Sequence, residues 1–142
     1  MYLTGTYQHN LDAKQRLTLP ADFRRQISGT VYLVKVLECV YGFTPEEHEA
    51  YVKSLFPGGF DPRDRRQDEL RRAINAQTVM TDVDSAGRVS LSKMSEKVRD
   101  MLGREVVIVG NTDHFEVWNA TTWNEKQAAL TDEDFEALLF GE

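Results

Sequence analysis

The sequence contains an internal repeat, and this repeat limits the possible folds more than any other feature. Residues 11–19 read LDAKQRLTL, and 72 positions later residues 83–91 read VDSAGRVSL. The Asp, the Arg and the final Leu coincide, and the other two apolar positions stay apolar. After three extra residues in the second copy, the match resumes in residues 31–34 against 106–109 and in residues 43–46 against 118–121. Three matches in the same order predict two copies of one small structural unit.

Each copy is predicted to begin with a β-hairpin. Residues 16–19 and 88–91 alternate polar and apolar side chains, as half-buried strands do. The preceding residues 5–8 and 78–81 can supply the partner strands. The residues between the two strands favour a turn, because Asp accepts hydrogen bonds from backbone N–H groups two residues on and Gly87 tolerates a positive φ. Each hairpin tip would then present Asp on one side and Arg on the other.

Further strands and helices are predicted after each hairpin. Strand pairs are expected at 31–36 with 38–43 and at 105–109 with 114–118, the second pair joined by a turn at 110–113. Candidate helix starts stand at Pro20, Ser92, Thr44, Asp61-Pro62, Asn119 and Thr131. Pro20 and Ser92 would begin matching short helices, and Thr44 and Asn119 the helices that end each copy. The helix from Asp61-Pro62 would end near Gln77.

The formal charge of −6 does not exclude a nucleic-acid partner, because the charge is unevenly distributed. Residues 113–142 hold eight acidic residues and one basic residue, so the rest of the chain carries +1. DNA affinity depends on local basic patches rather than on the charge of the whole chain. The five arginines between Arg63 and Arg72 alternate with acids, and pairing along a helix accounts for most of them. We do not count that region as a DNA site.

The single cysteine and the hydropathy pattern favour a cytoplasmic protein. Cys39 lies in an apolar run, which predicts a buried and inert thiol. No apolar run approaches the ~20 residues that span a bilayer. The first residues contain neither the basic region nor the apolar stretch of an export signal.

The repeated units resemble the bacterial MraZ family, whose units are swapped-hairpin domains of the AbrB type. The resemblance spans about residues 5–130 and rests on Asp12/Arg16 with Leu19-Pro20 and Phe23-Arg24, on Asp84/Arg88 with Leu91, and on strand 115–118 leading to Trp123. It implies an α+β, β-rich fold in which two tandem AbrB-like units form an intrachain pseudo-dimer with flanking helices. The expected division is domain 1 at 5–51, a linker and helix at 52–76, domain 2 at 77–122, and an acidic helical segment at 123–142.

The same resemblance implies a function. It implies a sequence-specific transcription regulator that represses the cell-division and cell-wall gene cluster, including its own promoter. The expected partner is double-stranded DNA with short direct repeats, and the expected location is the nucleoid. Similar proteins assemble into rings, so a ring-like homo-oligomer is expected. The resemblance implies no catalytic activity and no cofactor. On the residues themselves we expect no metal site and no small-molecule substrate.

We predict that Lys14, Arg16, Arg24, Arg25 and Arg88 contact DNA, with the first copy providing most of the surface. The planar fork of arginine can bind guanine edges or phosphate through paired hydrogen bonds. The alternative is that Arg16 and Arg88 bond back to the Asp of their own turn and only stabilise it. Both roles can coexist if the Asp orients the guanidinium. Lys14 can also be an idle surface lysine, and Arg24 and Arg25 a solvated helix face.

The remaining turn residues are predicted to be structural. Asp12, Asp84 and Gly87 would shape the turns rather than contact DNA. Gln15 stands where the second copy has Gly87, and Lys14 faces only Ala86. The two tips are therefore not expected to be equivalent.

Other functions receive less support from the sequence. His9, His48 and His114 lack ligand spacing, and residues 82–87 begin like a calcium loop whose twelfth position is Lys93 instead of Glu. The functional alternative is an antitoxin-like module that binds a protein partner or only builds a ring, without specific DNA binding. The second copy and the structured ending argue against it. A small-molecule-binding β-barrel lacks a cluster of convergent polar groups.

Overall fold

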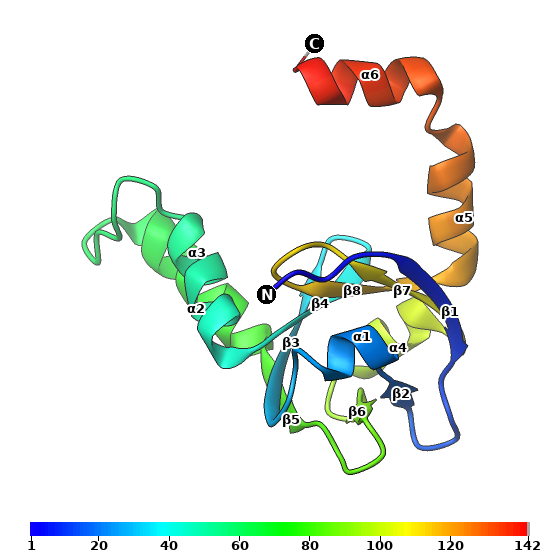
Figure 1. Ribbon diagram of the computed structural model, residues 1–142. Helices are drawn as coiled ribbons and strands as arrows, with labels where there is room; N and C mark the ends of the chain where they lie inside the picture. The colour runs from blue at the N-terminus through cyan, green and yellow to red at the C-terminus, as the bar shows by residue number, and fades with distance from the viewer. Residues whose placement is uncertain (142) are drawn as a thin grey trace.

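The strands of the two copies form one shared structure. The computed structural model describes residues 1–141. Its main sheet is antiparallel, with the order β1-β7-β8-β4-β3-β5, and β2 pairs with β6 in a separate two-stranded ribbon (Figure 1). The strands are β1 (Thr6–Asn10), β2 (Arg16–Thr18), β3 (Thr30–Val36), β4 (Cys39–Phe43), β5 (Val79–Asp82), β6 (Arg88–Ser90), β7 (Glu105–Gly110) and β8 (Phe115–Asn119).

Each copy exchanges strands with the other. β1 of the first copy pairs with β7 of the second, and β5 of the second pairs with β3 of the first. β2 pairs with β6, and neither pairs with the strand that precedes it in the chain. The predicted hairpin within each copy is therefore wrong, because polar–apolar alternation identifies the buried face of a strand but not its neighbour. The predicted α+β swapped-hairpin pseudo-dimer is confirmed.

The two copies share one hydrophobic core. Leu17 of β2 and Val89 of β6 are fully buried, and they face each other across the ribbon. The ring of Phe23, from the first copy, lies 6.3 Å from that of Phe115, from the second. Gly42 of β4 leaves room for the ring of Phe115, its partner on β8, since a Cβ at this position would clash with the ring. A unit of about fifty residues has only a marginal core of its own, so burying apolar side chains of both copies in one core favours the exchange.

Six helices complete the part of the chain that the structure describes. Three predicted N-caps are confirmed: the side chains of Thr44, Asn119 and Thr131 accept hydrogen bonds from the backbone N–H groups of Glu47, Thr122 and Asp134. The helices are α1 (Ala21–Arg24), α2 (Pro45–Ser54), α3 (Arg65–Gln77), α4 (Glu96–Leu102), α5 (Ala120–Ala129) and α6 (Asp132–Phe140). The predicted domain boundaries at 51/52 and 122/123 fall inside α2 and α5, and the division stays a prediction.

Two helices begin three residues later than predicted. Ser95, not Ser92, caps α4, because the three extra residues of the second copy form a turn after Leu91. Asp64, not Asp61, caps α3, because Asp61 instead accepts the N–H groups of Arg63 and Asp64 in a preceding turn. Pro20 lies at the N-cap of α1 instead of its first helical position.

The last two helices extend away from the sheet. Figure 1 shows α5 leaving the sheet at the end of β8 and α6 continuing beyond it, apart from α2 and α3 on the other side of the molecule. Within residues 1–141, no helix combines the length and the apolar character that a membrane span requires. Cys39 is buried as predicted, and burial raises the pKa of its thiol to about 12.

Candidate nucleic-acid interface

The first Asp-x-x-x-Arg turn is held together by one carboxylate. Oδ1 of Asp12 accepts hydrogen bonds from the backbone N–H groups of Lys14 and Arg16, both at 2.9 Å. Oδ2 accepts from Nε of Arg16 at 2.7 Å. The backbone N–H of Asp12 donates to the carbonyl of Arg16 at 3.1 Å and closes the turn. Asp12 therefore fixes both the backbone and the direction of the arginine.

The second turn repeats this geometry. Oδ1 of Asp84 accepts from the N–H groups of Ala86 at 3.0 Å and Arg88 at 2.8 Å, and Oδ2 accepts from Nε of Arg88 at 2.7 Å. The backbone hydrogen bond from Arg88 is the main cause of a lowered pKa at Asp84. The corresponding bond from Arg16 lowers the pKa of Asp12 from 3.8 to about 2. Both carboxylates therefore keep their negative charge to a lower pH than an ordinary Asp does.

Each turn is also bonded to the opposite copy. Gln15 and Gly87 occupy the left-handed region, with φ of 61° and 77°. The carbonyl of Gln15 accepts from the N–H of Leu91 at 2.9 Å, and that of Gly87 accepts from the N–H of Leu19 at 2.9 Å. These matching bonds make the two turns a pseudo-symmetric pair beside the β2–β6 ribbon. Figure 1 shows the loops that lead into β2 and β6 next to this ribbon.

The ribbon presents both arginines on one face. Arg16 lies opposite Ser90 and Thr18 lies opposite Arg88, while Leu17 and Val89 occupy the buried face. All four residues of the outer face are partly exposed. Two guanidinium groups and two hydroxyl groups therefore project from a short antiparallel ribbon. The major groove of B-DNA is wide enough to admit a ribbon of this kind.

Arg16 and Arg88 make the contacts of the predicted structural alternative, because each bonds back to the Asp of its own turn. Their contact with DNA stays a prediction. In residues 1–141, each arginine makes its side-chain hydrogen bonds through Nε, and neither terminal nitrogen has a hydrogen-bond partner. The side chains remain 27% and 35% exposed. The Asp bond therefore orients a guanidinium whose outer edge can donate to a ligand.

The other predicted DNA residues surround the ribbon in different ways. Lys14 is exposed in the first turn, and its counterpart is Ala86. Arg25 is 72% exposed and pairs with Asp22 at 2.7 Å. Arg24 donates from Nε to the carbonyl of Leu19 at 3.0 Å and lies directly over the second turn.

Gly87 leaves the space that Arg24 occupies. A Cβ at Gly87 would clash with Nε of Arg24. The predicted structural role of Gly87 thus has two physical reasons, a positive φ and the close approach of an arginine from the other copy.

Sequence reasoning missed three polar side chains near the ribbon. Arg99 is the counterpart of Arg24 once the three extra residues are counted, and its Nε donates to the carbonyl of Met94 at 3.2 Å. Arg99 lines a shallow hollow with Gln15 of the opposite copy. Thr18 and Ser90 were the polar members of the predicted strands, so alternation could have identified them.

The structure offers no metal centre in the part of the chain it describes. No group of three or more His, Cys, Asp or Glu side chains in residues 1–141 is arranged to hold an ion. His114 instead lies buried between Asp113 at 2.8 Å and Glu116 at 2.9 Å, stacked on Tyr41.

Comparison with known proteins identifies the family. The family model described as "MraZ protein, putative antitoxin-like" matches the chain twice, over residues 2–69 and 74–139. The chain is 33% identical to the transcriptional regulator MraZ of Oenococcus oeni, over 94% of this chain and 92% of that protein. It is 34% identical to that of Lactobacillus gasseri, over 85% and 83%, and 31% identical to that of Mycoplasmoides gallisepticum, over 90% and 89%. The chain belongs to the MraZ family, which is a family of transcriptional regulators and not of enzymes.

Proposed function

We propose that this chain is a sequence-specific DNA-binding repressor that inserts its β2–β6 ribbon into the major groove. The observation that supports this most is the pair of Asp-oriented arginines on the outer face of the ribbon. Their terminal nitrogens would donate to guanine edges, and Thr18 and Ser90 would bond to neighbouring bases or phosphates. An arginine already held by an Asp loses less freedom on binding, because its rotamer is fixed in advance.

The basic residues around the ribbon would contact the phosphate backbone. Lys14 and Arg25 of the first copy are exposed, and Arg24 lies against the second turn. Arg99 lines a hollow together with residues of the first turn. Phosphate contacts set the register of a protein on DNA, whereas base contacts provide specificity. We therefore assign Arg16 and Arg88 to specificity and the other basic residues to affinity.

The proposed targets are short direct repeats upstream of a cell-division and cell-wall gene cluster that includes the protein's own gene. Several copies in a ring-like homo-oligomer would place their ribbons on successive repeats. Linked binding events strengthen one another through a high effective concentration, so weak single contacts would add up to a stable complex. The proposed site of action is the nucleoid in the cytoplasm.

The test is fluorescence anisotropy with DNA from upstream of the protein's own gene and with a scrambled sequence of the same composition. We expect tighter binding to the native sequence and a steep loss of affinity with added salt, because phosphate contacts release counterions. Equal affinity for the two DNAs would contradict the proposal.

The family description also names an antitoxin-like role, which corresponds to the protein-interaction alternative. That role predicts a stable complex with a protein partner that forms without DNA. A chain that lacks DNA preference and co-purifies with one such partner would support this second candidate.

A further inference from the structure

The C-terminal helix α6 carries an apolar stripe with no cover in residues 1–141. Phe135, Leu138 and Leu139 follow the i, i+3, i+4 spacing of one helix face, and they are 57%, 72% and 65% exposed. The rest of the helix includes Asp132, Glu133, Asp134 and Glu136. A helix of nine residues is marginally stable in water unless an apolar face is buried. The stripe has the pattern with which amphipathic helices bind hydrophobic grooves.

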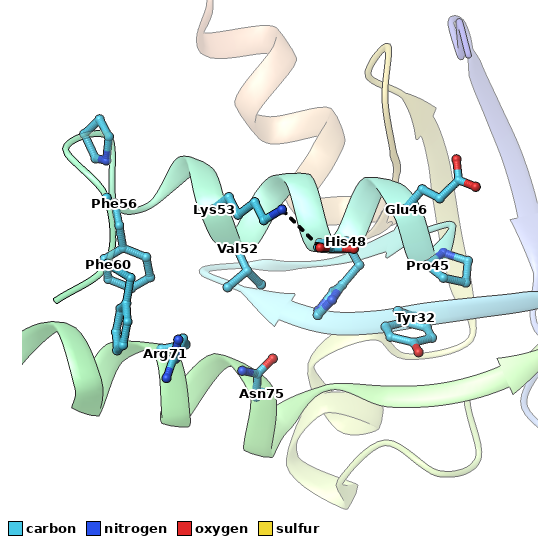
Figure 2. A pocket seen from close by; sticks show the side chains of 13 residues that line it. Tyr32, Pro45, Glu46, His48, Val52, Lys53, Phe56, Phe60, Arg71 and Asn75 are labelled. Atoms are coloured by element: carbon cyan, nitrogen blue, oxygen red, sulfur yellow. Dashed lines mark ion pairs between the residues drawn. The ribbon is translucent and has the colours of Figure 1, made fainter. Parts of the chain in front are cut away.

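A groove lined largely by apolar side chains lies between α2 and α3. It has a volume of about 780 Å³. Figure 2 shows Val52, Phe56 and Phe60 along it, with Arg71 and Asn75 projecting from α3. The Arg71 guanidinium carbon lies 3.4 Å from the centre of the Phe60 ring. Pockets of about 300–1,000 Å³ can enclose several apolar groups, so the groove can accept a stripe of three side chains.

The charges of α6 and of the α3 side of the groove are complementary. α3 holds four arginines and two acidic residues, whereas α6 holds four acidic residues and no basic one. α2 is acidic, and its Glu49 is paired with Lys53 at 3.1 Å. An incoming α6 would therefore direct its acids toward α3, where Arg71 lies at the rim of the groove.

We propose that α6 of one copy docks into the α2–α3 groove of a second copy of this chain. The helix and the groove lie on different sides of one molecule (Figure 1), so each copy offers one helix and one groove. Such a contact is head-to-tail. Repeating it from copy to copy closes a ring when the rotation between neighbouring copies returns the last copy to the first. The inference rests on the ring-like oligomer of the proposed function and names the surface that builds it.

The first test is the molar mass in solution, measured by light scattering after gel filtration. The expected mass of the wild-type protein is several times the 16.3 kDa of one chain. L138S/L139S on α6 and R71E in the groove each reduce the mass to that of one chain. L37S is the matched control, because Leu37 is 83% exposed on the β3–β4 turn and its loss leaves the mass unchanged. A wild-type mass of one chain, or unchanged assembly in both interface variants, overturns the proposal.

Cross-linking between two variants identifies the pair of surfaces. One variant carries L138C on α6 and the other K53C at the rim of the groove, while the native Cys39 is buried. A short bis-maleimide gives a covalent dimer in the mixture of the two, and none in either variant alone. A dimer from L138C alone would show helix-to-helix pairing and overturn the proposal. A link within a dilute chain that carries both cysteines would show that α6 occupies its own groove, and this also overturns it.

DNA binding separates this inference from the proposed function. An assembled wild-type protein with the predicted cross-link but no DNA preference contradicts the function and leaves the interface standing. A single-chain wild-type protein that still prefers its own upstream DNA contradicts the interface alone. L138S/L139S is expected to keep the preference for a single repeat and to lose the added affinity for several repeats. Far-ultraviolet circular dichroism of each variant is the control for folding.

Discussion

The two turns, residues 12–16 and 84–88, share one hydrogen-bond framework but carry different side chains. In both, an Asp carboxylate accepts two backbone N–H groups and the Nε of an arginine, with every distance between 2.7 and 3.0 Å. The differences are Lys14 against Ala86 and Gln15 against Gly87. The framework is thus a property of the fold, because both copies need it to hold the β2–β6 ribbon. The variable positions are where the two halves of the ribbon can differ in what they bind.

The largest expected effect is the loss of DNA affinity when either ribbon arginine is replaced. Because Arg16 and Arg88 have the same contacts, R16A and R88A should each weaken binding to the native DNA by about 1–3 kcal/mol, roughly 5- to 150-fold. The unfolding free energy should change by less than about 1 kcal/mol, because these ion pairs are partly exposed to solvent and each Asp keeps its two bonds from backbone N–H groups. Anisotropy and urea unfolding measure the two quantities.

The comparison of the two arginine variants tests the equivalence of the copies. A large loss for R16A with none for R88A would show that the shared framework serves DNA in one copy only. R72A is a suitable control, because Arg72 pairs with Asp68 on α3, away from the ribbon. Loss of folding in R16A would instead assign Arg16 to the turn.

The second prediction exchanges the left-handed residues. G87Q should destabilise the protein by about 1–2 kcal/mol, because a side chain at φ of 77° is strained and Arg24 must move. Q15G should change stability by no more than about 1 kcal/mol, because relief of strain is offset by the added backbone freedom of glycine. Thermal unfolding compares the two, and equal effects would contradict the larger penalty expected at Gly87.

The third prediction concerns the phosphate contacts. K14A should reduce the slope of log affinity against log salt by about 1, and A86K should increase it by about 1. The change should be similar for native and scrambled DNA, because a phosphate contact carries no sequence information. An unchanged slope in both variants would identify Lys14 as an idle surface residue.

Much of the fold was predictable, and the failures share a cause. The sheet strands, the 110–113 turn and the caps at Thr44, Asn119 and Thr131 follow from local residue chemistry and were confirmed. The pairing of β1 with β7 and of β2 with β6 connects residues far apart in the chain, and alternation within a strand is silent about its partner. The helix starts at Ser92 and Asp61 failed because polar turns with capping residues precede the true caps.

The candidate site was predictable in residue type but not in arrangement. The repeat identified Asp12, Arg16, Asp84 and Arg88, yet placed them on two separate tips. The structure brings them to the two ends of one ribbon. Arg99 escaped notice because the three extra residues shift it out of the frame in which Arg16 and Arg88 coincide. Its place beside a hollow that the opposite turn also lines depends on the strand exchange, which no local pattern contains.

The smallest expected effect is the loss of stability at acid pH. The pKa of Asp12 is lowered from 3.8 to about 2, so its carboxylate stabilises the native state fully above the unfolded value. That contribution is lost as the pH falls from about 4 to about 2, because the unfolded chain takes up the proton first. A neutral D12N side chain mimics the protonated acid, so the stability difference between wild type and D12N should shrink over this range. D84N should behave in the same way, because the same bonds lower the pKa of Asp84. Urea unfolding at a series of pH values measures both differences, and a difference that stays constant down to about pH 2 would mean that the carboxylate charge does not stabilise the turn.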